Sequence, residues 1–163
     1  MVTGESVRDY GIHPDLATIF PYDSLGNSIE PHTEESRLFW AMRKLLKTRR
    51  DFGATPEERR LRWFDHSMFF PNRFRTRLGI AFAFVATHNH FVLDRGGKVF
   101  NRSAPVIKLP ADATEDDHLE LLGVLNSSTA AFWLKQNSHN KGEGGGARVD
   151  AGYAALGSES WRN

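Results

Sequence analysis

Residues 80–94, IAFAFVATHNHFVLD, are the stretch that decides the fold of this chain. Aromatic and β-branched residues dominate it, and such residues are enriched in strands. The segment 95–98, RGGK, has the composition of a turn, and 99–102, VFNR, that of a returning strand. We therefore predict a β-hairpin here. A further short strand is predicted in APVIKLP, residues 104–110.

A helix is predicted to follow these strands. Thr114 has the side chain of an N-cap, and Asp116 and Asp117 would lie in the first turn, where negative charge suits the helix dipole. The apolar stripe of this helix would consist of Leu119, Leu122 and Leu125. The segment 126–128, NSS, interrupts the pattern and provides side chains that cap a second helix.

The N-terminal half predicts a different mixture of elements. Residues 15–23, DLATIFPYD, have the pattern of a strand that enters a turn. A helix is predicted from an N-cap at Thr33 to Gly53, and TPEE at 55–58 forms a capping box that opens a short helix to about His66. Together the segments predict an α+β fold in which helices flank a small mixed β-sheet.

Composition excludes several classes of protein. With 163 residues the chain fits one domain, and because it contains no cysteine it has neither disulfides nor thiolate zinc sites. No apolar run approaches the roughly 20 residues of a membrane span, and the polar, acidic N-terminus is unlike a signal peptide. No Walker-type phosphate loop or hydrolase nucleophile elbow is present. We expect a cytoplasmic protein without membrane contact.

The charge is distributed unevenly, although the net charge is only +1. Residues 1–36 hold one basic and seven acidic side chains, residues 37–80 hold twelve and four, and residues 81–163 hold eight and nine. A basic centre in a near-neutral chain is typical of a surface that faces a polyanion. A solvated helical face is the alternative. Within this centre the cations at strand spacing are Arg73, Arg75 and Arg77, which would share one face of an extended segment.

Two histidines raise the alternative of a metal site. His88 and His90 lie two apart in a predicted strand, so their side chains would point to one face, and Asp94 would join them. A small metal-dependent nuclease using these three residues is therefore one hypothesis. A polar face of a hairpin, with no metal, is the simpler interpretation.

Four stretches together resemble a known family. GESVRDYGI at 4–12 followed by IFPYD at 19–23 resembles the entry to the target-recognition region of TaqI-like, adenine-specific DNA methyltransferases. The segments 82–110, FAFVATHNHFVLDRGGKVFNRSAPVIKLP, and 118–142, HLELLGVLNSSTAAFWLKQNSHNKG, give a closer resemblance, of which residues 87–110 are the most particular part and the LLGVLNSS…FWLK helix is shared more loosely among specificity subunits. They resemble the C-terminal specificity region of the PglX methyltransferases of BREX phage-defence systems. The resemblance covers nearly the whole chain, most specifically residues 80–142.

The resemblance implies a recognition part without its catalytic partner. Members of the family bind S-adenosylmethionine and act on adenine through an Asn-Pro-Pro-Tyr or Asn-Pro-Pro-Phe motif, which this sequence lacks. We therefore expect no cofactor on this chain and S-adenosylmethionine on the parent enzyme. The fold would resemble a restriction-modification target-recognition domain. Its segments would be an entry strand and loop at 1–32, a basic helical segment at 33–79, a hairpin and helix core at 80–141, and a glycine-rich, truncated tail at 142–163.

The resemblance and the charge pattern both favour contact with double-stranded DNA. Phosphate contacts are expected from Arg73, Arg75 and Arg77, supported by Arg49 and Arg50. Base or backbone contacts are expected from His88, Asn89, Asn101 and Arg102, because Asn suits adenine and Arg suits guanine in the major groove. Further partners would be the catalytic domain of the parent enzyme and other defence-system proteins. A protein-interaction fragment of the defence complex is the remaining alternative.

Overall fold

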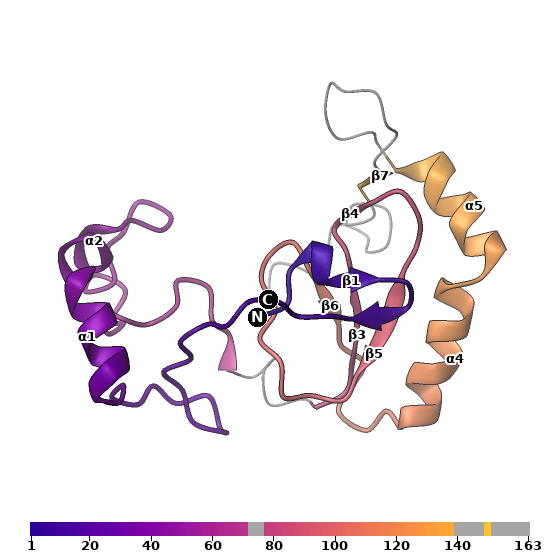
Figure 1. Ribbon diagram of the computed structural model, residues 1–163. Coiled ribbons are helices and arrows are strands. Elements are labelled where there is room, and N and C mark those ends of the chain that lie inside the picture. Colours follow the sequence, from indigo (N-terminus) through magenta and orange to yellow (C-terminus); the bar gives the residue numbers. More distant parts are fainter. Residues whose placement is uncertain (72–76, 139–148, 151–163) are drawn as a thin grey trace. The chain divides into compact units, whose positions relative to one another are not determined.

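The computed structural model describes residues 1–71, 77–138 and 149–150 (Figure 1). The chain divides into two compact units. We call Met1–Ala17 together with Thr76–Asn163 the sheet unit, and Thr18–Arg75 the basic unit. The predicted α+β class is confirmed, because the chain combines small antiparallel sheets with separate helices.

A three-stranded antiparallel sheet is the centre of the sheet unit. Strand β3 (Gly79–Phe82) lies between β5 (Phe91–Asp94) and β6 (Val106–Ile107). The register pairs Phe82 with Phe91 and Gly79 with Asp94. All four β3 residues are buried, as expected of a central strand. A separate antiparallel pair joins β4 (Val85–Ala86) to β7 (Val149–Asp150).

Helix α4 (Glu115–Leu125) lies beside β5 and is followed by α5 (Ser128–Asn137) (Figure 1). Both helices contribute apolar side chains to one core of the sheet unit. The buried members of this core are Ile80, Phe82, Phe91 and Leu134, and Ile107, Leu121, Leu122 and Leu125 pack around them. Burying a side chain the size of Phe91 contributes about 1.5–3 kcal/mol to folding. This core therefore holds sheet and helices together.

The N-terminal residues build a second core. They form a 3₁₀ helix, η1 (Gly4–Ser6), and a hairpin of β1 (Val7–Arg8) and β2 (Gly11–Ile12). The buried members of this core are Val2, Val7 and Ala104, with Ile12, Val92 and Phe100 packed around them. Successive strand residues point to opposite faces, and Phe91 and Val92 accordingly belong to different cores.

The predicted hairpin forms, but with different strands and a different turn. Both of its strands, β3 and β5, lie within residues 79–94, so the segment THNH belongs to their connection. The prediction of a strand at His88 and His90 was therefore wrong. The predicted return strand pairs with the N-terminus instead: the Val2 amide donates to Val99 O at 2.7 Å, and the Asn101 amide donates to Val2 O at 3.0 Å. Sequence alone does not show this pairing, because its partners are about 100 residues apart.

The predicted helices that follow the strands are confirmed. Thr114 caps α4, since its hydroxyl accepts from the Asp117 amide at 3.2 Å and the Asp117 carboxylate accepts from the Thr114 amide at 2.7 Å. These bonds hold the pKa of Asp117 below its usual value. Ser127 caps α5 by accepting from the Ala130 amide at 3.1 Å. The predicted short strand of residues 104–110 is also confirmed, as β6.

Residues 33–48 of the basic unit form two short helices where one long helix was predicted. Helix α1 (Thr33–Ala41) ends at Met42, whose φ of −99° and ψ of 6° separate it from α2 (Arg43–Thr48). Thr33 is the first helical residue, not the N-cap, which is His32. The His32 amide donates to the Glu35 carboxylate at 3.1 Å. Because the Glu35 carboxylate pairs with the His32 amide, the helix starts one residue earlier than predicted.

Two other predictions in the basic unit were wrong. Residues 15–21 form no strand, since no neighbouring strand pairs with them. The capping box at 55–58 does form, with the Thr55 amide donating to Glu58 at 2.7 Å, but a single hydrogen-bonded turn stands in place of the predicted helix. Arg60 adopts a φ of +58°, and the Leu61 amide donates to Pro56 O at 2.8 Å. This is the bonding of a Schellman motif, which ends a helix.

The interior of the basic unit is a polar and aromatic network around Asp65. The buried Asp65 carboxylate accepts from the Ser28 hydroxyl at 2.6 Å and from the Arg62 amide at 2.8 Å. The Tyr22 hydroxyl accepts from the His66 amide at 2.6 Å. Burial raises the pKa of Tyr22 to about 12, because the phenolate would lose its hydration.

This pKa predicts a loss of stability in alkali. Between pH 10 and 12 Tyr22 ionises in the unfolded chain but stays protonated in the folded chain, so unfolding releases a proton and stability falls as pH rises. We expect the difference in ultraviolet phenolate absorbance between the unmodified chain and a Tyr22→Phe variant to titrate near pH 12. A difference titration centred near the ordinary tyrosine value would contradict the burial of this hydroxyl.

Candidate nucleic-acid interface

The connection between β4 and β5 is held against the junction of α4 and α5. The Asn126 side chain accepts from the Phe91 amide at 3.0 Å and donates to Phe91 O at 2.9 Å. Asn89 adds a third bond, from its side-chain amide to Leu125 O at 2.7 Å. The segment THNH is therefore positioned by backbone and amide contacts with the helices. The amide donor of Asn89 that we expected to contact DNA is used inside the protein.

His88 and His90 have different surroundings in this connection. His88 is exposed, whereas the His90 Nδ1 atom is buried and has no hydrogen-bond partner among the described residues. The His90 ring packs edge-on against Tyr10 at a centroid distance of 5.2 Å, and its centroid lies 6.3 Å from that of His88. Of the two, only His88 presents its side chain openly to a ligand.

A crevice of about 20 Å³ lies beside this loop. It is lined by Ala86, Thr87, His88, Asn89, Ala131, Leu134 and Lys135. Such a volume holds a water molecule but no nucleotide or cofactor. This part of the surface is therefore suited to contact with a large partner and not to enclosure of a small one.

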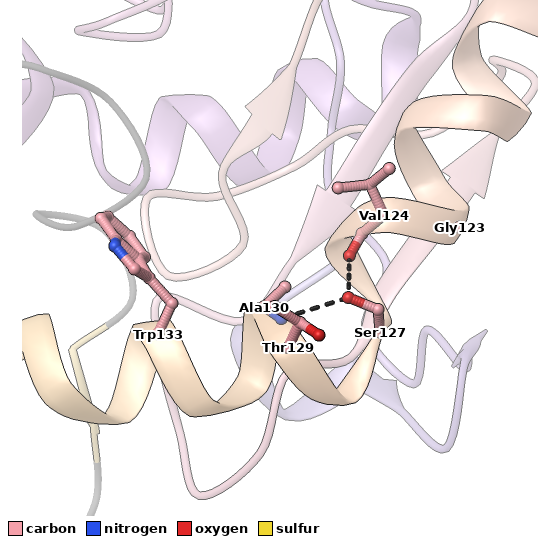
Figure 2. A pocket seen from close by; sticks show the side chains of 6 residues that line it. All are labelled: Gly123, Val124, Ser127, Thr129, Ala130 and Trp133. Atoms are coloured by element: carbon pink, nitrogen blue, oxygen red, sulfur yellow. Dashed lines mark hydrogen bonds between the residues drawn. The ribbon is translucent and has the colours of Figure 1, made fainter.

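A larger, open hollow of about 580 Å³ lies where α4 meets α5 (Figure 2). Its lining consists of Gly123, Val124, Ser127, Thr129, Ala130 and Trp133. The Ser127 hydroxyl is engaged there, since it donates to Val124 O at 2.7 Å and accepts from the Ala130 amide. Among the described residues no acid, base or cation lines the hollow, and the side chains that do line it are small or apolar.

The residues of the metal hypothesis do not form a ligand set. Asp94 ends β5 while His88 and His90 precede its start, and the Asp94 carboxylate is buried against the Lys98 ammonium at 2.7 Å. Within residues 1–71, 77–138 and 149–150 no group of three or more His, Asp or Glu side chains is arranged to hold a metal ion. The predicted common face of His88, His90 and Asp94 was thus wrong.

The predicted cationic contacts divide into engaged and open side chains. Arg49 is half-buried, donates to Asp65 O and lies 4.0 Å from the Asp51 carboxylate, whereas Arg50 is exposed and donates to Gly53 O at 2.8 Å. Arg77 and Arg102 are exposed. Arg73 and Arg75 lie outside the described residues.

Asn101 is engaged within its own loop. Its side-chain oxygen accepts from the Ser103 amide at 2.9 Å and from the Ser103 hydroxyl at 2.7 Å. Like Asn89, it supports the backbone next to an exposed neighbour. His88 and Arg102 are therefore the members of the predicted base-contacting set that remain open to a ligand.

Further open cations occur in the basic unit. Arg37, Lys44, Lys47 and Arg60 are exposed, and none of their side chains has a hydrogen bond or ion pair with another described residue. Lys44 and Lys47 are three apart in α2 and so lie on one side of that helix. The sequence indicated these cations only as part of the basic centre at residues 37–80. Their availability depends on where the acidic side chains are placed in the fold.

None of the described helices is long and apolar enough to cross a membrane.

The chain is similar to a segment of a characterised protein. No family model matches the sequence. Over 145 residues the chain is 41% identical to the adenine-specific methyltransferase PglX of Streptomyces coelicolor. The match covers 87% of this chain and 12% of that protein, so the chain spans about an eighth of the relative's length.

Two asparagines provide a test of the loop anchor. We expect Asn126→Ala to lower the free energy of unfolding by about 2–4 kcal/mol, because it leaves the amide and carbonyl of buried Phe91 unpaired. Asn137→Ala is the matched control, since exposed Asn137 bonds only within α5, to Trp133 O. Equal effects of the two substitutions in urea unfolding would contradict an anchoring role for Asn126.

Separate substitutions distinguish the bonded Asn89 of the THNH segment from the exposed His88. Asn89→Ala is expected to destabilise the chain by about 1 kcal/mol through loss of its bond to Leu125 O. His88→Ala removes an exposed side chain and is expected to change stability by less than about 0.5 kcal/mol. Thermal unfolding of both variants measures this difference, and a larger loss for His88→Ala would show that His88 is structural.

Proposed function

We propose that this chain is the DNA target-recognition part of an adenine-specific DNA methyltransferase of a BREX-type phage-defence or restriction-modification system. The observation that carries the proposal is the 41% identity to a PglX methyltransferase along 87% of the chain. In this proposal the chain binds duplex DNA in the cytoplasm and thereby positions a catalytic domain. The catalytic domain binds S-adenosylmethionine and transfers the methyl group.

The charge distribution of the basic unit supports binding to DNA. Exposed cations without a protein partner among the described residues release counterions when they meet phosphates, and this release supplies much of the affinity for DNA. Lys44 and Lys47 on α2 are the best placed of these. Arg73, Arg75 and Arg77 are proposed as further phosphate contacts from their spacing in the sequence.

Base contacts are proposed for His88 and Arg102. Both are exposed, and each stands beside an asparagine whose side chain holds the local backbone in place. An arginine side chain can bond two acceptors of guanine in the major groove. Asn89 and Asn101 would then act as supports, because their amide groups already bond to the protein.

A second role, contact with other proteins, is favoured by the apolar surface around the α4–α5 junction. Phe132 is 66% exposed, Trp133 50% and Val124 64%, and the last two line the open hollow. Exposed apolar patches of this kind mark interaction sites. We propose the catalytic domain of the methyltransferase as the partner here, and another protein of the defence system is the alternative occupant.

Salt dependence tests the proposed function. We expect the full chain to bind mixed-sequence duplex DNA, and a Lys44→Gln, Lys47→Gln double variant to reduce the slope of log affinity against log salt by about 2, because two phosphate contacts are lost. Fluorescence anisotropy of labelled DNA between low and physiological salt measures this slope.

The matched control removes two cations that already have acidic partners. Arg62 lies 3.0 Å from Glu30, and Arg95 lies 2.6 Å from Glu115. An Arg62→Gln, Arg95→Gln double variant should keep the slope of the unmodified chain. Absence of binding at low salt, by a chain shown to be folded, would refute the DNA-binding role.

A further inference from the structure

A tight turn in the basic unit displays a single aromatic side chain. Asp51 and Ala54 form an isolated antiparallel bridge, in which the Asp51 amide donates to Ala54 O at 2.9 Å and the Ala54 amide donates to Asp51 O at 3.1 Å. Between them Phe52 has a φ of +53° and Gly53 a φ of +83°. Two consecutive residues with positive φ are characteristic of a type I′ turn. Phe52 is 89% exposed.

The choice of residue at this position has no structural explanation. A type I′ turn favours Asn, Asp or Gly at its first central position, since other side chains meet the backbone in the left-handed region. The Phe52 ring forms no ring contact or cation–π contact with any described residue. By contrast, Tyr10 has a φ of +59° in the β1–β2 turn, and its ring packs on His90. Residues held in strained backbone conformations cluster at functional sites.

Arginines hold this turn and surround it with positive charge. Arg50 donates to Gly53 O at 2.8 Å, which places its guanidinium at the turn. The Asp51 carboxylate lies 3.1 Å from the Arg59 guanidinium and 4.0 Å from that of Arg49. Three guanidinium groups thus lie at or near the turn, against two carboxylates: that of Asp51, which faces Arg49 and Arg59, and that of Glu58, which interacts with Arg50. The turn is a fixed platform that combines net positive charge with an exposed aromatic ring.

We propose that Phe52 is an aromatic wedge that inserts between stacked bases of duplex DNA, while the exposed Arg50 beside it contacts a flanking phosphate. This inference rests on the proposed DNA-binding function and adds the residue that deforms the duplex. Apolar side chains inserted at a base step unstack it and bend the helix. Charge complementarity favours DNA over a protein partner, because the surroundings of the ring are cationic and DNA supplies both phosphates and aromatic faces.

The substitution Phe52→Asn separates binding from folding. Asparagine is favoured in this backbone conformation, so the variant should melt at the same or a higher temperature than the unmodified chain. Its affinity for duplex DNA should fall about tenfold, because one stacking contact is lost. The salt dependence should keep its slope, since no cation is removed. In duplexes that carry 2-aminopurine, fluorescence should rise on binding of the unmodified chain and not of the variant.

Tyr10→Asn is the matched control, because it replaces an exposed aromatic residue in the same kind of turn. The affinity of this variant for duplex DNA should equal that of the unmodified chain. If the unmodified chain binds no DNA at low salt, the proposed function itself fails. If it binds and Phe52→Asn binds equally well, or if no duplex position shows unstacking, only the wedge is overturned. If Phe52→Asn binds DNA normally but no longer binds a separately produced catalytic domain, Phe52 is a protein contact instead.

Discussion

The two hydrogen bonds between the Asn126 side chain and the backbone of Phe91 are the contact on which the sheet unit depends. Phe91 begins β5 and is almost completely buried in the larger core, while Asn126 lies where α4 gives way to α5. A side-chain amide can pair with both polar groups of one residue as a neighbouring strand would. The helix break and the loop before β5 are therefore placed by the same residue.

The basic unit is built on a different principle. Its interior is organised by the buried Asp65 carboxylate, which links a loop hydroxyl and a backbone amide, and Arg49 donates to the carbonyl of the same residue. Beyond this network many large apolar side chains remain exposed, including Trp40, Leu45 and Phe52. A unit of this size has little apolar area to bury, so polar bonding carries more of its specificity. The consequence is a surface rich in both cations and aromatic rings.

The exposed cations, aromatic rings and apolar side chains correspond to the three kinds of contact that we propose. Phosphates require open cations, unstacked bases require exposed rings, and protein partners require apolar patches. In the basic unit Lys44 and Lys47 are open cations and Phe52 is an exposed ring. In the sheet unit the hollow near Trp133 is an apolar patch. The open side chains of the molecule thus suit large partners, in agreement with the lack of an enclosed pocket for a small ligand in the described part of the chain.

The sequence predicted which types of residue the candidate interface contains, but not which of their side chains are exposed and which bond to the protein. The basic centre and the resemblance to methyltransferase recognition regions both indicated DNA. The sequence did not show that Asn89 and Asn101 bond to the protein, nor that His88 and His90 leave the strand. The Asn89 bond depends on Leu125, which is 36 residues away and is brought there by folding, whereas the Asn101 bonds to Ser103 are local to its own loop.

What the sequence by itself determined are the features that depend on neighbours within a few residues. The caps of Thr114 and Ser127 and the α+β class are of this kind, because a cap bonds to an amide three residues away. Only the tertiary structure decided which strands pair, where the long helix breaks and which cations stay open. Strand pairing joins Val2 to residue 99, and the burial of a charge depends on acids far along the chain. Such contacts follow from the packing of the whole unit and from no local pattern.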